Sequence, residues 1–79
     1  MELIISSPLE QRTLHVAWFE IDTPAGNFII QAGHIPTLLT LLPNHTLTIR
    51  LKSGKQETIA ASSGIVHVTR QRSTIILGD

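Results

Sequence analysis

The residues of this 79-residue chain that are best suited to metal chemistry are its four histidines, His15, His34, His45 and His67. Imidazoles on adjacent strands of a small β-barrel can hold zinc or iron. Two ligands on one face of a strand would lie two residues apart, and no histidine pair has this spacing. No carboxylate accompanies them at a short ligand interval either. The pattern favours surface or turn histidines, so we expect no metal site.

A nucleophilic constellation could be drawn from Ser62 or Ser63 together with His34 and Asp22. The segment Ala60-Ala61-Ser62-Ser63-Gly64, however, lacks the glycine that a nucleophile elbow has two residues before its serine. None of the five glycines belongs to a phosphate-binding Gly-x-x-x-x-Gly-Lys or Gly-x-Gly-x-x-Gly run. We therefore expect neither a catalytic residue nor a bound cofactor.

Two residues have the character of protein contacts instead. Trp18 offers the largest single contact surface in the chain, and tryptophan is enriched where proteins dock. It lies on the strand face opposite Phe19 and Ile21, so it is either a partly buried core residue or an interface residue. His34 stands between a glycine and a proline. It either ends a strand as an ordinary polar residue or is presented to a partner on a rigid corner.

The composition predicts an aliphatic core and excludes a nucleic-acid partner. Hydrophobic residues make up 42% of the chain, with two phenylalanines, one tryptophan and no tyrosine. The core must therefore consist of Ile, Leu, Val and Ala, a mixture that suits packed sheets. Six basic and six acidic residues cancel and are interleaved along the chain, so no field is strong enough to drive phosphate binding.

The absence of cysteine excludes both a disulfide framework and a thiolate metal site, and we expect a cytosolic setting. The N-terminus carries an acidic residue where a secretory signal has a basic one, and its apolar run is short. No apolar run approaches the roughly 20 residues of a membrane span. Any association with a membrane is therefore expected to go through a partner protein.

The elements that must position these residues are short β-strands. Period-two alternation recurs along the chain, helical periodicity is nearly absent, and turn residues return about every eight to twelve positions. We predict a single all-β domain over residues 1–79, a small two-sheet β-sandwich of about eight to ten short strands. The expected strands are Leu3–Ile5, Gln11–Val16 continuing as Val16–Asp22, Asn27–Ala32, Thr46–Leu51, Gln56–Ala61, Ile65–Thr69 and Ser73–Leu77, with a crossover through Ile35–Thr40.

The alternation also predicts which side chains share a face. In the long strand, Ala17, Phe19 and Ile21 face one way, and Trp18 and Glu20 face the other. In the strand 46–51 the apolar set is Leu47, Ile49 and Leu51, and the set toward water is Thr48 and Arg50.

The turn after that strand can be predicted from the same alternation. A slip of one residue would place Ile59 on the face opposite Ile49. A two-residue loop Ser53-Gly54 fails this test, whereas a three-residue loop Lys52-Ser53-Gly54 passes it. Glycine at the third position then supplies the left-handed conformation that such loops need.

The most distinctive stretch of the chain is Gly26–Leu42, where a glycine precedes an aromatic strand and a Gly-His-x-Pro step follows. Before it, Leu3–Pro8 reads as a first strand that ends in Ser-Pro. After it come Ile59–Val68 and Thr74–Asp79. In this order the segments resemble the sandwich domain of the epsilon subunit of F-type rotary ATP synthases. Gly26-Asn27-Phe28 is similar to the family's Gly-Glu-Phe, and Gly33–Thr40 to its Gly-His-Ala-Pro-Leu-Leu-Thr run.

The resemblance implies a ten-stranded sandwich at the foot of the central stalk. Such a domain is clamped to the gamma subunit and rests on the ring of membrane c subunits, at the cytoplasmic face of the inner membrane and peripheral to it. Its work is mechanical: it couples rotation to ATP synthesis while catalysis occurs on other subunits. The resemblance therefore implies no enzyme activity, no cofactor and no metal.

The resemblance also implies contact residues. Asn27 and His34 match positions that lie near the polar loops of the membrane ring in the family. Together with Gln31, on the same strand, and Trp18 they form the predicted partner-contact set. The chain departs from the family pattern in that Asn27 replaces an acidic residue, and Ile29 and Ser63 each replace a glycine, which indicates a divergent member.

In the family a C-terminal helical hairpin follows the sandwich and acts as a brake on ATP hydrolysis. It would begin where this chain stops, so we expect no inhibition from residues 1–79. Two alternatives remain at this stage. One is a free-standing β-sandwich interaction module unrelated to ATP synthesis, and the other, more remote, is a small metal-binding β-barrel.

Overall fold

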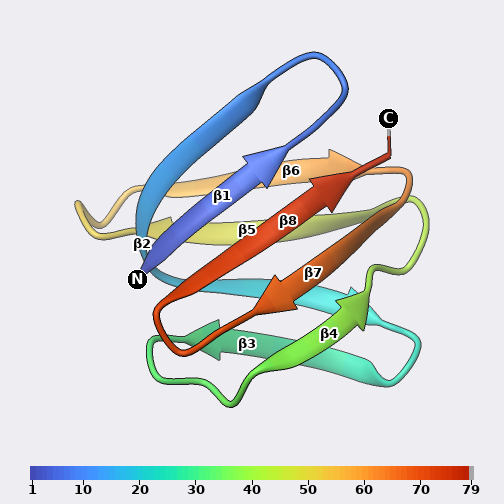
Figure 1. Ribbon diagram of the computed structural model, residues 1–79. Coiled ribbons are helices and arrows are strands. Elements are labelled where there is room, and N and C mark those ends of the chain that lie inside the picture. Colours follow the sequence, from blue (N-terminus) through green and yellow to red (C-terminus); the bar gives the residue numbers. More distant parts are fainter. Residues whose placement is uncertain (79) are drawn as a thin grey trace.

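The computed structural model describes residues 1–78, which form eight β-strands (Figure 1). Asp79, the last residue of the C-terminal motif, lies outside them. No helix that is long and apolar enough to cross a membrane occurs in the described residues. The strands are β1 (Glu2–Ser6), β2 (Gln11–Thr23), β3 (Gly26–Gln31), β4 (Thr37–Thr40), β5 (His45–Leu51), β6 (Gln56–Ala61), β7 (Gly64–Val68) and β8 (Arg72–Leu77).

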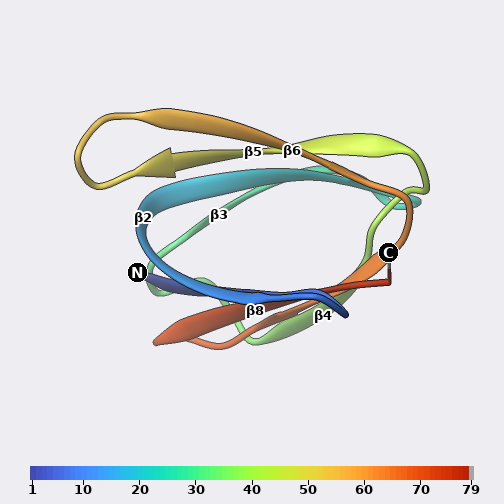
Figure 2. The ribbon, with the colours of Figure 1, turned by 90° about the horizontal axis from the view of Figure 1, so that it is seen from above.

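The strands form two layers that face each other, which confirms the predicted sandwich (Figure 2). Sheet A has the order β4-β7-β8-β1-β2, in which β1 and β8 are parallel and the other pairs antiparallel. Sheet B has the order β3-β2-β5-β6. Residues 1–78 form eight strands and not the ten implied by the resemblance, and β2 runs through both sheets as one strand of 13 residues.

A β-bulge lets β2 pass from one sheet to the other. Val16 pairs with Leu51, but Trp18 pairs with Arg50, so one extra residue, Ala17, lies on β2 between these pairs. The bulge reverses the side-chain alternation. Val16 is buried before it and Phe19 after it, while Ala17 is exposed. The prediction that Ala17 shares the face of Phe19 is therefore wrong, because strict alternation does not continue through a corner where a strand changes sheets.

The core lies between the two sheets. Its largest fully buried side chain is Phe19, and aliphatic residues from both inner faces surround it. Full burial of one such side chain stabilises the fold by about 1.5–3 kcal/mol. Leu47 and Ile49 face inward as predicted. The buried hydrophobic set is Leu3, Ile5, Val16, Phe19, Ile21, Ile30, Leu41, Leu47, Ile49, Ala61, Val66, Val68 and Ile75.

The predicted three-residue turn between β5 and β6 is confirmed. The amide of Leu51 donates to the carbonyl of Lys55 at 2.8 Å, which leaves three residues in the loop. Gly54 has φ = 95°, the conformation that only glycine adopts readily.

The predicted crossover after β3 is also observed. It ends in β4, a strand that the alternation of the sequence did not predict. Residues 32–36 leave sheet B, and β4 then pairs with β7 at the edge of sheet A. β3 and β4 are thus neighbouring edge strands of the two layers (Figure 1).

Candidate docking surfaces

Three of the four predicted contact residues share the outer face of sheet B. Trp18 pairs with Gln31, and Asp22 pairs with Asn27, so these side chains point away from the core on β2 and β3. Asn27 and Gln31 are exposed, and Trp18 is half-buried. Within residues 1–78 β3 pairs only with β2, so it leaves an open edge along which Asn27 and Gln31 lie about 13 Å apart.

Trp18 is held in place by Arg50. The guanidinium carbon of Arg50 lies 5.8 Å from the centre of the indole ring, within the range of a cation–π contact. The same guanidinium donates to the Gly54 carbonyl and to Oε1 of Gln56, both at 2.9 Å. Arg50 was expected to point to water, but stacking on Trp18 leaves it half-buried. Trp18 is therefore an outer-face residue with a fixed orientation, and not a core residue.

His34, the fourth predicted residue, lies in the crossover just beyond β3. Gly33, at φ = 83°, turns the chain there, and the His34 amide donates to the Gln31 carbonyl at 3.2 Å. The His34 Nδ1 lies 2.8 Å from the Ile35 carbonyl. A carbonyl only accepts, so Nδ1 carries the proton of this hydrogen bond. The structure thus brings His34 close to Gln31, at the end of β3 opposite to Asn27.

Asn27 belongs to a polar cluster at its own end of β3. Its Nδ2 donates to Oδ1 of Asp22 at 2.9 Å and to the Ile21 carbonyl at 3.4 Å. The Asp22 Oδ2 lies 3.2 Å from Nδ1 of His45, at the start of β5. The hydrogen bond from Asn27, and then that from His45, lower the pKa of Asp22 below its ordinary value. Asp22 is therefore a stable carboxylate at neutral pH.

The lowered pKa predicts how this cluster responds to acid. The folded-state pKa of Asp22 lies below the unfolded value near 3.8, so its contribution to stability is present above that value and lost as the pH falls through the folded pKa. Asp22→Asn is expected to lower the urea midpoint at about pH 6 and to have a smaller effect at about pH 3. Glu10→Gln, at an exposed acid outside the cluster, controls for the loss of a charge. An equal effect of Asp22→Asn at both pH values would contradict the prediction.

The residues considered for catalysis do not come together. Asp22 is bonded to His45, and His34 is bonded to its own chain at Ile35. Ser62 and Ser63 lie in the turn between β6 and β7. The histidines sit on four separate elements, and within residues 1–78 no three potential ligands form a group that could hold a metal ion.

A second surface, which the sequence analysis did not identify, lies on the outer face of sheet A. Leu38, Ile65 and Ile76 are 69%, 47% and 52% exposed, and we call these three residues the sheet A patch. Ile65 pairs directly with Ile76, and Leu38 pairs with His67, two residues along β7 from Ile65. The patch spans three adjacent strands, and contiguous exposed apolar surface of this kind marks interaction sites.

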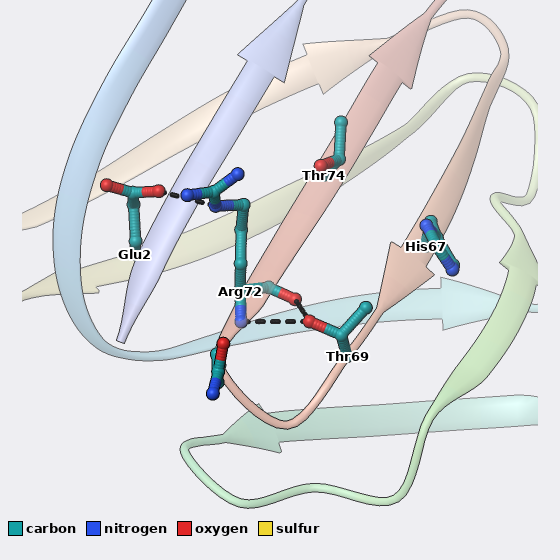
Figure 3. Close-up of a pocket in the computed structure, with 6 residues that line it drawn as sticks. Glu2, His67, Thr69, Arg72 and Thr74 are labelled. Atoms are coloured by element: carbon teal, nitrogen blue, oxygen red, sulfur yellow. Dashed lines mark hydrogen bonds and ion pairs between the residues drawn. The ribbon is translucent and has the colours of Figure 1, made fainter.

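Grooves flank the sheet A patch on two sides. An apolar groove of about 430 Å³ is lined by Pro24, Leu41 and Pro43 together with Ile65 and Ile76 of the patch. The second groove, of about 530 Å³, is polar (Figure 3). Its lining residues are Glu2, His67, Thr69, Gln71, Arg72 and Thr74.

The cation in the polar groove is already paired. Arg72 turns toward Glu2 on β1, and its Nε lies 2.6 Å from the Glu2 carboxylate (Figure 3). The Thr69 hydroxyl closes the turn before β8 by bonding both the amide and the carbonyl of Arg72. The groove therefore offers a balanced acid and base beside an apolar patch, which suits a protein surface better than a free anion.

A signal for the sheet A patch was present in the sequence. Ile75-Ile76-Leu77 and Ile65-Val66 are uninterrupted apolar runs, and a strand with one solvated face does not need apolar residues on both faces. In the structure one face of these strands packs on the core, and Ile65 and Ile76 are exposed on the other.

A family model of the β-sandwich domain of the ATP synthase delta/epsilon chain matches residues 3–79. The search of curated proteins found no match.

Two solved structures share the fold over nearly the whole chain. One is the cryo-EM structure of the Tetrahymena thermophila mitochondrial ATP synthase central stalk and c-ring, with a TM-score of 0.86, 20% identity, and coverage of 100% of this chain and 63% of that chain. The other is the Euglena gracilis mitochondrial ATP synthase, solved as OSCP/F1/c-ring in rotational state 1, with a TM-score of 0.83, 26% identity, and coverage of 95% and 48%. The chain therefore spans 63% and 48% of the lengths of these two matches.

Proposed function

The chain belongs to the family of the ATP synthase delta/epsilon β-sandwich domain, and on this premise we propose that it is a non-catalytic central-stalk subunit of a rotary F-type ATP synthase. In this role it docks on the gamma subunit and on the membrane c-ring and helps to couple rotation to ATP synthesis. The observation that carries the proposal is the presence of two distinct outer surfaces on one sandwich, an apolar one on sheet A and a mainly polar one along β3.

The sheet A patch is the surface that we assign to the gamma subunit. A permanent partner in a rotating stalk must be held tightly, and long-lived interfaces are more hydrophobic than transient ones. Leu38, Ile65 and Ile76 supply exposed apolar side chains on a flat sheet, and the Glu2–Arg72 pair supplies a polar rim. Burial of this patch would remove the largest exposed hydrophobic side chains of sheet A from water.

The β3 edge, which comprises Asn27, Gln31 and His34, is the surface that we assign to the c-ring. Asn27 and Gln31 are polar and exposed, and His34 is polar and half-buried, which suits a contact with the polar loops of a membrane ring. Ile29, which is 51% exposed, lies between Asn27 and Gln31 on the same face. Trp18 lies next to Gln31 and extends this surface over sheet B. These four residues are the predicted partner-contact set, now divided into an edge and an adjoining face.

A mechanical role needs no reactive group, and the arrangement of polar residues supports a non-catalytic subunit. The clearest potential nucleophile partners, His34 and His45, are each tied to a neighbouring oxygen on the surface. We propose that the chain associates with the membrane only through these partner subunits, as a peripheral component. The cytoplasmic face of an inner membrane is the location that we propose for it.

The test of this function is co-elution with the gamma subunit of the parent synthase in size-exclusion chromatography at micromolar concentration. One joint peak is the expected result. Two independent peaks would favour a free-standing β-sandwich module, and stoichiometric metal in an elemental analysis would favour a metal-binding barrel.

His34→Ala provides a sharper form of the same test. Because the His34 side chain is half-buried and its ring is bonded to the neighbouring Ile35 carbonyl, the substitution is expected to change the unfolding midpoint little. Binding to a gamma and c-ring subcomplex is expected to weaken by about three- to tenfold, as for one hydrogen bond of about 1 kcal/mol. A large fall in thermal stability would instead show that His34 is a structural residue.

A further inference from the structure

Asp22 joins three segments of the chain at one corner of the molecule. Its side chain accepts hydrogen bonds from Asn27 on β3 and from His45 on β5. Its backbone carbonyl accepts from the Leu42 amide, in the connection between β4 and β5, at 2.9 Å. The tip of the β2–β3 hairpin and the β4–β5 connection are thus fastened to each other through one residue.

The acceptors around the side-chain amide of Asn27 determine how this residue is presented. Both acceptors near its Nδ2, the Asp22 carboxylate and the Ile21 carbonyl, can only accept, so the amide nitrogen must face them. Both amide hydrogens are then used inside the cluster, and no hydrogen bond among the described residues engages Oδ1. Asn27 is exposed, so this oxygen is available to a partner as an acceptor.

We propose that Asp22 is a positioning residue for the β3 edge. It holds the side chain of Asn27 so that Asn27 Oδ1 accepts a hydrogen bond from an N–H group of the c-ring. The inference rests on the proposed function, because it takes the β3 edge as a contact surface. Asp22 acts through Asn27 and not by touching the partner. A side chain that is already fixed loses less rotamer freedom on binding, and loss of this restraint corresponds to about a three- to tenfold weaker affinity.

The chain offers a matched control for this role. Glu20 lies on the same face of β2, two residues from Asp22, and is also half-buried. It carries the same charge and pairs with Ile29, not with Asn27. Glu20→Ala therefore removes a carboxylate from the same surface without releasing Asn27.

A double-mutant cycle with the full chain and a purified gamma and c-ring subcomplex tests the proposal. Asp22→Ala and Asn27→Ala are each expected to weaken binding by about three- to tenfold, and the double variant is expected to bind no more weakly than Asn27→Ala alone. Asp22→Asn, which keeps an oxygen that can accept from Asn27, is expected to retain most of the affinity, and Glu20→Ala all of it. Additive losses, or an Asp22→Asn variant as weak as Asp22→Ala, would show a direct charge contact and overturn the proposal.

NMR of the isolated chain separates this inference from the function on which it rests. In Asp22→Ala the side-chain amide signals of Asn27 are expected to move to the position and mobility of a free asparagine, while those of Gln31 stay unchanged. Unchanged Asn27 signals would overturn the positioning role. A wild-type chain that fails to bind the subcomplex, but shows this NMR change, would refute the proposed function and leave the Asp22–Asn27 coupling established.

Discussion

Replacement of Phe19 by alanine is expected to remove a large share of the free energy of unfolding of this domain. Phe19 is fully buried at the point where β2 has just entered sheet B, and both inner faces pack around it. A buried phenylalanine cut to alanine costs about 3–5 kcal/mol, through lost burial and the cavity that remains. A domain of this size has only about 4–12 kcal/mol of stability in total, so the loss removes a large share of it.

Urea unfolding followed by tryptophan fluorescence measures this loss, since Trp18 is the one tryptophan of the chain and lies next to Phe19. Leu9→Ala is the control, because Leu9 is 97% exposed and its truncation is expected to change stability by less than about 0.5 kcal/mol. A loss below about 1 kcal/mol for Phe19→Ala would mean that the two sheets do not pack around this residue.

Leu38→Asp is expected to have the largest effect on docking. The substitution places a charge in the sheet A patch, where it would be desolvated without a partner when the gamma subunit binds. We expect the affinity for gamma to fall by at least about 30-fold, corresponding to about 2 kcal/mol for a central interface residue. Folding is expected to be retained, since Leu38 is 69% exposed and contributes little to the core.

Isothermal titration calorimetry of the chain with the gamma subunit measures this affinity. Thr58→Asp introduces the same charge on the exposed outer face of β6 in sheet B, and is expected to leave the affinity unchanged. Equal losses from the two variants would show that sheet A has no special part in docking and that added negative charge alone weakens the complex.

Most of the fold could be predicted from the sequence. Apolar and polar residues alternate within most strands, and the turns contain residues, such as glycine, that favour the turn conformation. Gly54 is the clearest case. The requirement that Ile49 and Ile59 lie on the same face predicted a three-residue loop, and the observed φ of 95° at Gly54 is the left-handed conformation that this loop needs. Ala17 is the clearest failure. The change of sheet within β2 depends on which strands pair with its two halves, and local alternation carries no information on that pairing.

The candidate sites could be predicted only in part, for a related reason. Trp18, Asn27 and Gln31 share a face because β2 and β3 form a local hairpin, which the sequence indicates. The sheet A patch depends on the pairing of β4 with β7 and of β7 with β8, and the first of these joins distant segments. The bond between Asp22 and His45 likewise spans 23 residues, and the constellation considered from the sequence had grouped Asp22 with His34 instead.

The absence of cysteine makes one measurement especially direct. Single cysteines placed at Ile76, His34 and Thr58 can each carry a photoactivatable cross-linker in the assembled synthase. The account predicts a product with the gamma subunit from position 76, a product with the c subunit from position 34, and no product with either from position 58. Cross-links to gamma or c that form equally from position 58, or from none of the three positions, would contradict the assignment of this domain to the central stalk through two separate docking surfaces.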